Sequence, residues 1–268
     1  MLTADKTITI NDVLVRQYLL HKHNVNNIAL PPKRTKKLIG VTIHNTIDLP
    51  GVADDPEQYT RATVNGNMSS VRVHYYADEL GAWQNLDTAY CNWTCTDGTG
   101  SGNMQTIAIE CIMDGTSGEN NLKARDNTAR LAAWLLYVNG LTADDLYTHT
   151  YWLHIRDGHK GTKRELMTRP HPYKTCPYYI IPDWDGFCSL VKTYFNALKS
   201  GFKSYKIRIK EDLNVRKGAG TNNPVVMVLH KNEVYTITAE KKVGTVRWGK
   251  LKSGVGWVSL LDKYSDKI

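Results

Sequence analysis

Apolar and polar residues follow different patterns in the two parts of this chain of 268 residues. Up to about residue 200, short apolar runs alternate with stretches of helical spacing. Residues 38–46 and 106–112 indicate buried strands, and residues 122–138 indicate a helix that ends at Asn139-Gly140. The resulting order, β–α–β–β–β–α–β–α, predicts an α/β fold with one mixed central sheet flanked by helices.

Several smaller elements complete this expectation. A short helix is expected around Val13 to Leu20, before a basic loop that contains prolines. Asp55 is expected to cap the next helix, which has proline at its first position. A strand is expected from Leu146 to Trp152, with His149 inside it, and residues 153–173 form a polar, basic insertion.

The last quarter of the chain has another pattern. Short strands follow one another without a helix between them, and turns of Gly, Asn, Pro and Ser separate the strands. This pattern predicts a small all-β barrel. We therefore expect two domains, residues 1–200 and residues 201–268. The expected strands are Lys206–Ile209, Asn214–Arg216, Val225–Leu229, Glu233–Ala239, Trp248–Leu251 and Gly256–Leu260.

The formal net charge of +8 lies entirely in the second of these domains. Residues 201–268 hold 14 Lys and Arg against 6 Asp and Glu, whereas the rest of the chain holds 20 of each sign. Such a surplus predicts contact with an anionic partner. Nucleic acid and an anionic cell-wall polymer are the two candidates that charge alone suggests.

Composition also bears on the compartment. No stretch approaches the ~20 apolar residues of a membrane span, and the first residues lack the basic and apolar regions of a secretory signal. We therefore expect a protein that begins in a cytoplasm and does not enter a membrane. The five cysteines are few and odd in number, so no disulfide framework is expected. Cys91 and Cys95 are expected to be ordinary thiols.

Residues far apart in the sequence carry side chains suited to one metal site. His44, His149 and Cys176 offer two imidazoles and a thiolate, which leave a fourth position for water, as in a catalytic zinc site. Glu110 interrupts an apolar strand and is a candidate general base. Lys174 could stabilise a developing oxyanion, so the set suits amide hydrolysis. Taken singly, these are also compatible with packed strand histidines, a buried thiol, an outward-facing glutamate and a surface lysine.

Four short segments carry a resemblance to a known family. In order and setting they resemble the zinc-dependent N-acetylmuramoyl-L-alanine amidases of the amidase-2 family, which is related to peptidoglycan recognition proteins. The resemblance covers roughly residues 30–195 and implies the mixed sheet of that family. The segments are Val41-Thr42-Ile43-His44-Asn45-Thr46, Val73-His74-Tyr75-Tyr76-Ala77-Asp78, Ile107-Ala108-Ile109-Glu110 and Lys174-Thr175-Cys176-Pro177.

The resemblance implies roles for particular residues. His44 matches the first zinc histidine of the family, and Cys176 matches the third ligand, a position filled by Cys or Asp. Glu110 matches the catalytic glutamate of bacterial and phage members. Lys174 matches the lysine of the family's Lys-x-Cys/Asp-Pro ending. The cofactor implied is therefore Zn²⁺.

Two departures from the family pattern affect the site. The second zinc histidine usually lies about eight residues before the third ligand, where this chain has Thr168. We assign His149 instead, because its surroundings resemble the family's strand-end histidine. His154 and His171 remain alternatives.

The second departure concerns a tyrosine that some members carry just before the histidine matching His74. This chain has Val73 there, which leaves more of the proton transfer to the catalytic glutamate. We expect His74 to be structural or to line the substrate groove. Asn45 is the other candidate for substrate contact.

The tail resembles a bacterial SH3-like cell-wall-binding domain, through residues 213–221 and 254–258. Tyr235, Trp248 and Trp257 are candidate wall-binding residues, although core positions are equally compatible with their pattern.

Together the two resemblances imply a peptidoglycan hydrolase of the phage endolysin type. It would cleave the amide between N-acetylmuramic acid and L-alanine with zinc-activated water, and wait as a monomer in the host cytoplasm until it reaches the wall. Peptidoglycan and anionic wall polymers would be its partners. A bacterial autolysin of the same chemistry and a non-catalytic peptidoglycan-binding protein are the alternatives. Nucleic acid is not expected as a partner, because the chain has no basic helix or aromatic–basic RNA signature.

Overall fold

A computed structural model describes residues 2–49, 51–116 and 118–268. The chain divides into two units, residues 1–191 and residues 192–268. Each unit contains one seven-stranded sheet. The helices are α1 (Asp55–Val64), α2 (Ser101–Gln105), α3 (Glu119–Val138), α4 (His149–Arg156), α5 (Lys163–Thr168), the 3₁₀ helix η1 (Ile181–Asp183) and α6 (Trp184–Ser200).

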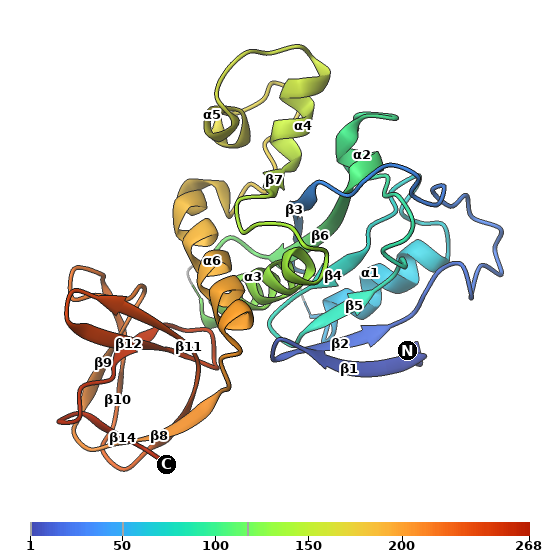
Figure 1. The fold of residues 1–268 in the computed structure, drawn as a ribbon. Helices are drawn as coiled ribbons and strands as arrows, with labels where there is room; N and C mark the ends of the chain where they lie inside the picture. The colour runs from blue at the N-terminus through green and yellow to red at the C-terminus, as the bar shows by residue number, and fades with distance from the viewer. Residues whose placement is uncertain (1, 50, 117) are drawn as a thin grey trace. The chain divides into compact units, whose positions relative to one another are not determined.

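The first unit is built on a mixed sheet with the order β1-β2-β5-β4-β6-β3-β7 (Figure 1). The strands β4, β6, β3 and β7 run parallel to one another, and the antiparallel pairs are β1 with β2 and β4 with β5. The predicted mixed central sheet flanked by helices is confirmed. The strands are β1 (Lys6–Ile10), β2 (Val13–Gln17), β3 (Gly40–Ile47), β4 (Tyr75–Ala77), β5 (Ala82–Gln84), β6 (Thr106–Met113) and β7 (Leu146–Thr148).

Helices cover both faces of the central strands. Ala108 and Ile112 of β6 form an apolar cluster with Tyr59 of α1, so this face of the sheet packs on α1. Side chains alternate along a strand, and Cys111 therefore points to the other face, toward Thr128 of α3. The first five residues of β3 and nearly all of β6 are buried, and burial on both faces explains the apolar run of β6.

Gly40 opens β3 because no side chain fits there. A Cβ atom on this residue would lie 2.3 Å from the backbone oxygen of Asp145 and 2.5 Å from the ring of Tyr147. Val41 then donates its backbone N–H to the same Asp145 oxygen at 3.0 Å. The glycine thus lets β7 lie close beside β3, which places the residues that follow both strands near one another.

The predicted helix around Val13 to Leu20 is wrong. Residues 6–17 form the β1–β2 hairpin, whose two-residue turn is Asn11-Asp12, with positive φ angles of 47° and 67°. Asn and Asp tolerate this conformation, and such turns match the twist of paired strands. Val13 and Val15 are buried while Leu14 between them is exposed, which is the alternation of a strand.

Two predicted element boundaries also need correction. The cap of α1 is Asp54, whose carboxylate accepts the N–H of Glu57 at 3.0 Å. The carboxylate of Asp55 instead accepts the backbone N–H of Leu49, in the loop before α1. The strand predicted from 146 to 152 ends at Thr148, whose hydroxyl accepts the N–H of Tyr151 and starts α4 there. His149 is therefore the first residue of a helix.

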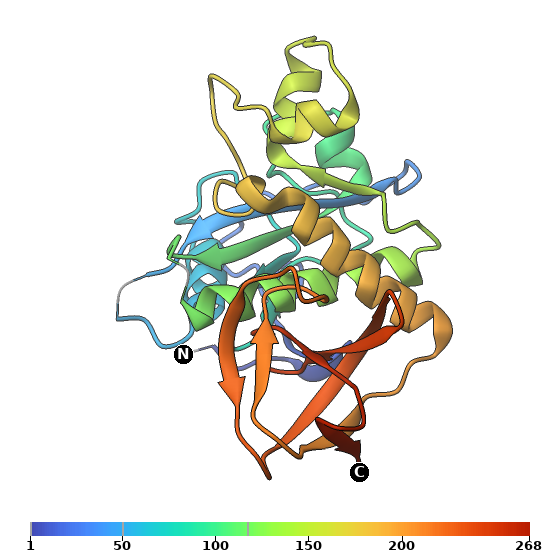
Figure 2. The same ribbon diagram turned by 90° about the vertical axis from the view of Figure 1, so that its left-hand side faces the viewer.

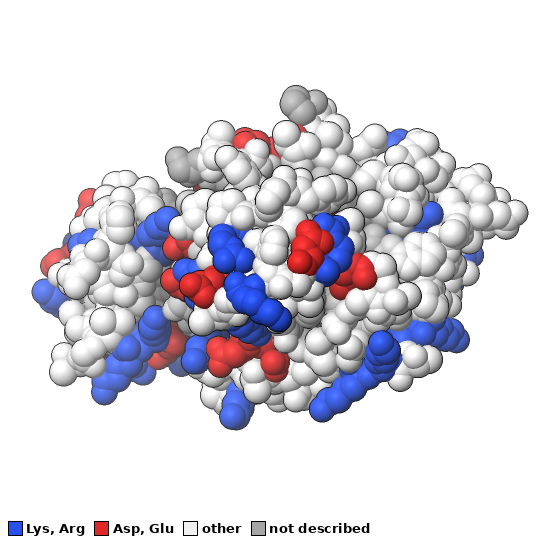
Figure 3. Space-filling view, turned by 90° about the horizontal axis from the view of Figure 1, so that it is seen from above, with Lys and Arg blue, Asp and Glu red and all other residues white. Residues whose placement is uncertain are grey.

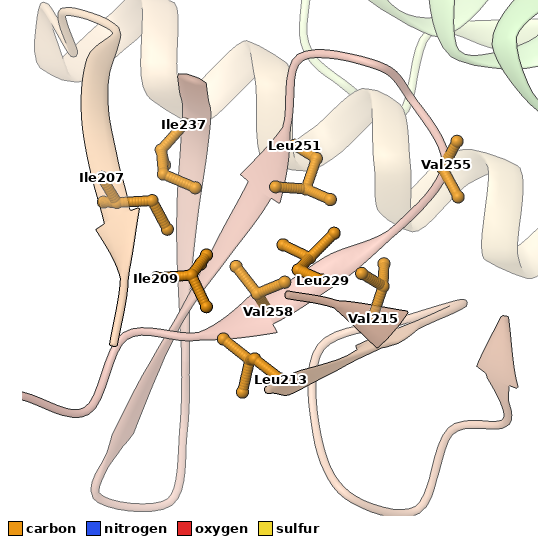
Figure 4. Close-up of a cluster of buried hydrophobic side chains, with 9 residues drawn as sticks. All are labelled: Ile207, Ile209, Leu213, Val215, Leu229, Ile237, Leu251, Val255 and Val258. Atoms are coloured by element: carbon orange, nitrogen blue, oxygen red, sulfur yellow. The ribbon is translucent and has the colours of Figure 1, made fainter. Parts of the chain in front are cut away.

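The second unit is a sheet of antiparallel strands in the order β10-β9-β13-β12-β11-β8-β14. A cluster of buried aliphatic side chains forms its core, and Figure 4 shows these side chains pointing toward one another. The short last strand β14 was not predicted. The strands are β8 (Tyr205–Ile209), β9 (Leu213–Arg216), β10 (Val225–Leu229), β11 (Val234–Val243), β12 (Val246–Leu251), β13 (Trp257–Ser259) and β14 (Ser265–Lys267).

Across the described residues, no helix has the length and apolar character needed to cross a membrane. In the first unit, α4 and α5 pack on each other beyond the end of β7 (Figures 1 and 2).

Candidate metal centre

His44 and Glu110 face each other across the two central strands. They are register partners of the parallel pair β3 and β6, so their side chains point to the same face of the sheet. Nδ1 of His44 lies 3.9 Å from Oε1 of Glu110. The His44 side chain is buried, whereas that of Glu110 keeps 13 % of its exposure.

His149 reaches the same place through β7. The register of β3 and β7 pairs Ile43 with Thr148, and the residue that follows each of them is a histidine. The two imidazole rings lie with centroids 4.9 Å apart and planes inclined by 54°.

Cys176 comes from the loop after α5 and is anchored to the start of α4. Its backbone N–H donates to the hydroxyl of Thr150 at 2.7 Å, and its carbonyl accepts the N–H of Thr150 at 2.9 Å. Its Sγ atom lies 4.0 Å from Nδ1 of His44 and accepts the backbone N–H of Asn45 at 3.4 Å. His44, His149 and Cys176 thus place one potential ligand atom each within 4.8 Å of the others. The space between these three atoms is called the shared point below.

Each imidazole has one threonine beside its Nε2 atom, on the side away from the other ligand atoms. Thr94 Oγ1 lies 3.2 Å from Nε2 of His44, and Thr96 Oγ1 lies 3.2 Å from Nε2 of His149. These contacts leave Nδ1 of each ring directed at the shared point. Nδ1 of His149 is buried and has no hydrogen-bond partner among the described residues. The residues fit a zinc ion, because two imidazole nitrogens and a sulfur converge with one of these nitrogens otherwise unsatisfied.

The sequence did not reveal Thr94 and Thr96. The only available signal was the dense run of small polar residues in the loop that carries Cys91 and Cys95. Both thiols are buried, and Cys95 Sγ lies 3.9 Å from Nε2 of His44, on the side of the ring away from the shared point. Metal ligands commonly have such outer hydrogen-bond partners, which fix the tautomer of the ring.

Burial controls the protonation of the group. It lowers the pKa of His44 well below its usual value, with the charges of His149 and Lys174 acting in the same direction. Burial likewise lowers the pKa of His149 to about 3. Both rings are therefore neutral near pH 7 and keep a lone pair for a metal ion. The contact between His44 and Glu110 is for the same reason not an ion pair.

The pKa values of Glu110 and Cys176 are raised rather than lowered. Burial raises the pKa of Glu110 to about 7, against the opposing charge of Lys174. Burial and the charge of Glu110 raise the pKa of Cys176 to about 12. Without a cation this thiol is protonated, and a bound metal ion would displace its proton. Lys174 itself is exposed, and its positive charge acts on every group of the site.

Asn45 and His74 serve the structure around the site. Asn45 donates from Nδ2 to the carbonyl of Cys111 at 2.9 Å and accepts the N–H of Tyr179 at 3.0 Å. His74 is completely buried. Its Nδ1 accepts the N–H of Ala108, and its Nε2 donates to the carbonyl of Tyr90, both at 3.1 Å. These bonds use both ring nitrogens of His74 and favour the structural role over the other expected role, contact with substrate.

The alternatives for the second histidine lie elsewhere. Thr168, at the end of α5, is half-buried and donates its hydroxyl to the carbonyl of Arg164. His154 and His171 form a separate cluster with His159. Of the histidines weighed from the sequence, His149 is the one that the structure brings to His44 and Cys176.

The aromatic residues singled out in the tail differ in exposure. Trp248 and Trp257 are each only 4 % exposed, whereas Tyr235 is half-buried and donates its hydroxyl to Glu233. On the face seen in Figure 3, Lys and Arg side chains lie among Asp and Glu side chains rather than in one continuous basic band.

Residues 34–178 match the sequence profile of a family described as N-acetylmuramoyl-L-alanine amidase. A curated relative, the N-acetylmuramoyl-L-alanine amidase XlyA of Bacillus subtilis (strain 168), is 26% identical over 147 residues. The match covers 55% of this chain and 42% of that relative. The chain therefore matches less than half the length of the relative.

Solved structures with the same fold cover the first unit. PlyL has a TM-score of 0.53 at 22% identity, over 67% of this chain and 98% of PlyL. The PlyG catalytic domain has a TM-score of 0.52 at 24% identity, over 68% and 94% of the two chains. The catalytic domain of XlyA has a TM-score of 0.50 at 21% identity, over 66% and 98%. At these identities the similarity shows a shared fold.

Proposed function

The chain belongs to the N-acetylmuramoyl-L-alanine amidase family, and from this membership we propose that it is a peptidoglycan hydrolase of the endolysin type. The bond cleaved would be the amide that joins N-acetylmuramic acid to the L-alanine of the stem peptide. The observation that carries the proposal is the convergence of His44, His149 and Cys176 on one point, with Glu110 beside them.

His44, His149 and Cys176 would hold one zinc ion. Two imidazole nitrogens and a thiolate are favourable donors for zinc, and three protein ligands leave a position open, as catalytic sites require. When bound, zinc lowers the pKa of a water molecule toward ~7 and polarises a carbonyl oxygen. The unsatisfied Nδ1 of His149 supports this assignment, because a buried nitrogen without a partner is costly unless something binds it.

Glu110 would move the protons of the reaction. Its Oε2 atom is buried and has no hydrogen-bond partner among the described residues, so this oxygen can accept a proton from the attacking water. A pKa of about 7 suits both halves of the task at neutral pH, because the same carboxyl must then give the proton to the leaving nitrogen of L-alanine.

Lys174 would stabilise the negative charge that develops on the substrate oxygen. Attack on the amide carbonyl places negative charge on its oxygen, and a cation held nearby stabilises that charge. The ammonium group is exposed yet close enough to affect the pKa values of Glu110 and Cys176.

The second unit would hold the enzyme on the cell wall, through its surplus of positive charge and its exposed side chains. The protein would accordingly wait in the cytoplasm of a phage-infected host and act once it reaches the wall. A bacterial autolysin would use the same chemistry. A binding protein without catalysis is less favoured, since Glu110 and Cys176 would then have no chemical task.

Analysis of the ends released from purified wall tests the proposal. The protein should release new amino termini on L-alanine and no new reducing sugars. Glu110→Gln should keep its zinc and lose about 100-fold or more of the rate, whereas Cys176→Ser should lose the zinc ion held by His44 and His149. Glu119→Gln, at an exposed position of α3, is the matched control. New reducing sugars, or a native rate in Glu110→Gln, would overturn the proposal.

A further inference from the structure

A second histidine cluster lies at the end of α4. Nδ1 of His154 is 2.7 Å from Nδ1 of His159. The ring centroid of His171 lies 4.7 Å from that of His154 and 5.4 Å from that of His159. One nitrogen of each ring falls within 4.8 Å of the others. His154 and His171 are buried, whereas His159 is exposed.

Hydrogen bonds orient the first of these rings. Nε2 of His154 lies 3.0 Å from the carbonyl oxygen of Arg169, and a carbonyl only accepts, so Nε2 carries the proton. Nδ1 of His154 therefore presents its lone pair to the cluster. The short contact with His159 is then a hydrogen bond donated by Nδ1 of His159. Because His159 is exposed, its ring can shift that proton to Nε2 and present a second lone pair.

Asp157 lies at the edge of the cluster, beside His171. Its Oδ2 lies 3.0 Å from Nε2 of His171, yet this buried nitrogen makes no well-formed hydrogen bond. Arg156 donates to both oxygens of Asp157, at 2.6 Å and 3.0 Å. These two bonds fix the carboxylate in place. Nδ1 of His171 accepts the N–H of Tyr173 at 3.1 Å.

The surrounding segment has little apolar material to hold it. Between residues 157 and 175, Leu166 and Met167 are the apolar side chains that are buried. Small apolar cores of this kind are commonly completed by a metal ion or a disulfide. The segment leads directly to Lys174 and Cys176, so whatever fixes it also fixes two residues of the first site.

We propose that His154, His159 and His171, with Asp157 as fourth ligand, bind a second divalent metal ion of the zinc class. Four protein ligands make a closed, structural site rather than a catalytic one. The ion would join the end of α4 to the loop that delivers Cys176. This site goes beyond the proposed function and shares no ligand with the first centre.

The donor set suits zinc after the side chains close on one point. Imidazole nitrogens and carboxylate oxygens bind zinc at about 2.0–2.2 Å, which places tetrahedral ligands roughly 3.3 Å apart. His154 and His159 would separate slightly from their present 2.7 Å. His171 would coordinate through Nε2 and carry its proton on Nδ1, and the N–H of Tyr173, an exposed residue, would turn to water.

Zinc content of the full-length chain, loaded with zinc and dialysed, tests the site. The native chain should hold about two zinc ions, and either His159→Ala or Cys176→Ser should hold about one. The double variant should hold none. His230→Ala removes an exposed histidine of the second unit and should hold as much zinc as the native chain. His159 is exposed, so its replacement is compatible with folding.

Cobalt separates the two sites spectroscopically. In Cys176→Ser, Co²⁺ should give the visible absorption of a four-coordinate ion without a thiolate charge-transfer band, and His159→Ala added to that variant should abolish the absorption. A native chain with one zinc that His159→Ala retains would overturn the second site. Unchanged zinc in Cys176→Ser would instead count against the first site, so the two failures are distinguishable.

Discussion

The hydroxyl of Thr94 lies 3.2 Å from Nε2 of His44, on the side of the ring away from Cys176. Thr94 in turn donates to Oδ1 of Asn92 at 2.5 Å, so its oxygen is left to accept the proton of His44. Nδ1 of the ring is then deprotonated and aimed at the shared point. The loop of Thr94 therefore selects the tautomer that a metal ion requires.

Replacing Thr94 by Val should weaken zinc binding at the first site by about 10–100-fold, the usual effect of removing an outer hydrogen-bond partner of a ligand. Valine nearly matches threonine in shape, so the fold should persist. Competition with a chromogenic chelator, in a His159→Ala background that lacks the second site, measures the affinity. Thr128→Val changes a buried threonine of α3 and should leave zinc affinity unchanged. Equal affinities in the two variants would remove Thr94 from its positioning role.

The strands that build the site could be predicted, because their apolar runs are typical of strands buried on both faces. His44 and Glu110 stand out as polar residues in such runs. Their pairing could not be predicted, since the register of β3 and β6 depends on the assembled sheet. The same holds for His149, whose place follows from the pairing of Ile43 with Thr148.

Features set by bonds between side chains and backbone were missed. Thr148 ends a strand and caps a helix in one step, and no periodicity marks that change. The turn at Asn11-Asp12 depends on two positive φ angles, and its flanking residues also fit a short helix. The sequence leaves His154 and His171 as alternatives for the first site, because sequence distance cannot assign a histidine to one of two clusters.

Glu110 should make the metal-free protein less stable as pH rises. Its pKa is about 7 when folded against an ordinary 4.5, so the folded state binds the proton more tightly, and stability falls as pH rises through that interval. Glu110→Gln removes this loss. With chelator present, the variant should match the native chain at pH 4 and exceed it at pH 8, by at most about 3 kcal/mol.

Urea unfolding at the two pH values measures this difference. Glu119→Gln, on the exposed start of α3, is the control and should track the native chain at both. If Glu110→Gln is no more stable than the native chain at pH 8, the buried carboxylate of Glu110 does not destabilise the folded state. The expected result has a functional meaning: the residue proposed to move protons would be retained at the expense of stability.

The second unit offers two kinds of surface to a cell wall. Its surplus charge comes from exposed Lys and Arg side chains. Its outer strand β10 exposes Val225, Val226, Met227 and Val228 by 39–46 %, whereas Trp248 and Trp257 are buried. Contact through this strand would be apolar and independent of salt, whereas attraction through charge weakens as salt screens it.

Residues 201–268, which contain the whole aliphatic core of the second unit, should bind purified Gram-positive wall as an isolated fragment. We expect binding to fall as salt rises from 0.05 to 0.5 M, because the Debye length shrinks from roughly 14 Å to roughly 4 Å, and a salt-resistant fraction to remain. Val226→Ser with Met227→Ser should reduce that resistant fraction and leave the salt-sensitive part. Lys241→Gln with Lys242→Gln, at exposed positions of β11, should reduce the salt-sensitive part and leave the resistant fraction.

A fragment that binds no wall at low salt would refute the wall-binding role. Equal effects of the two double variants at every salt concentration would refute the division into two surfaces.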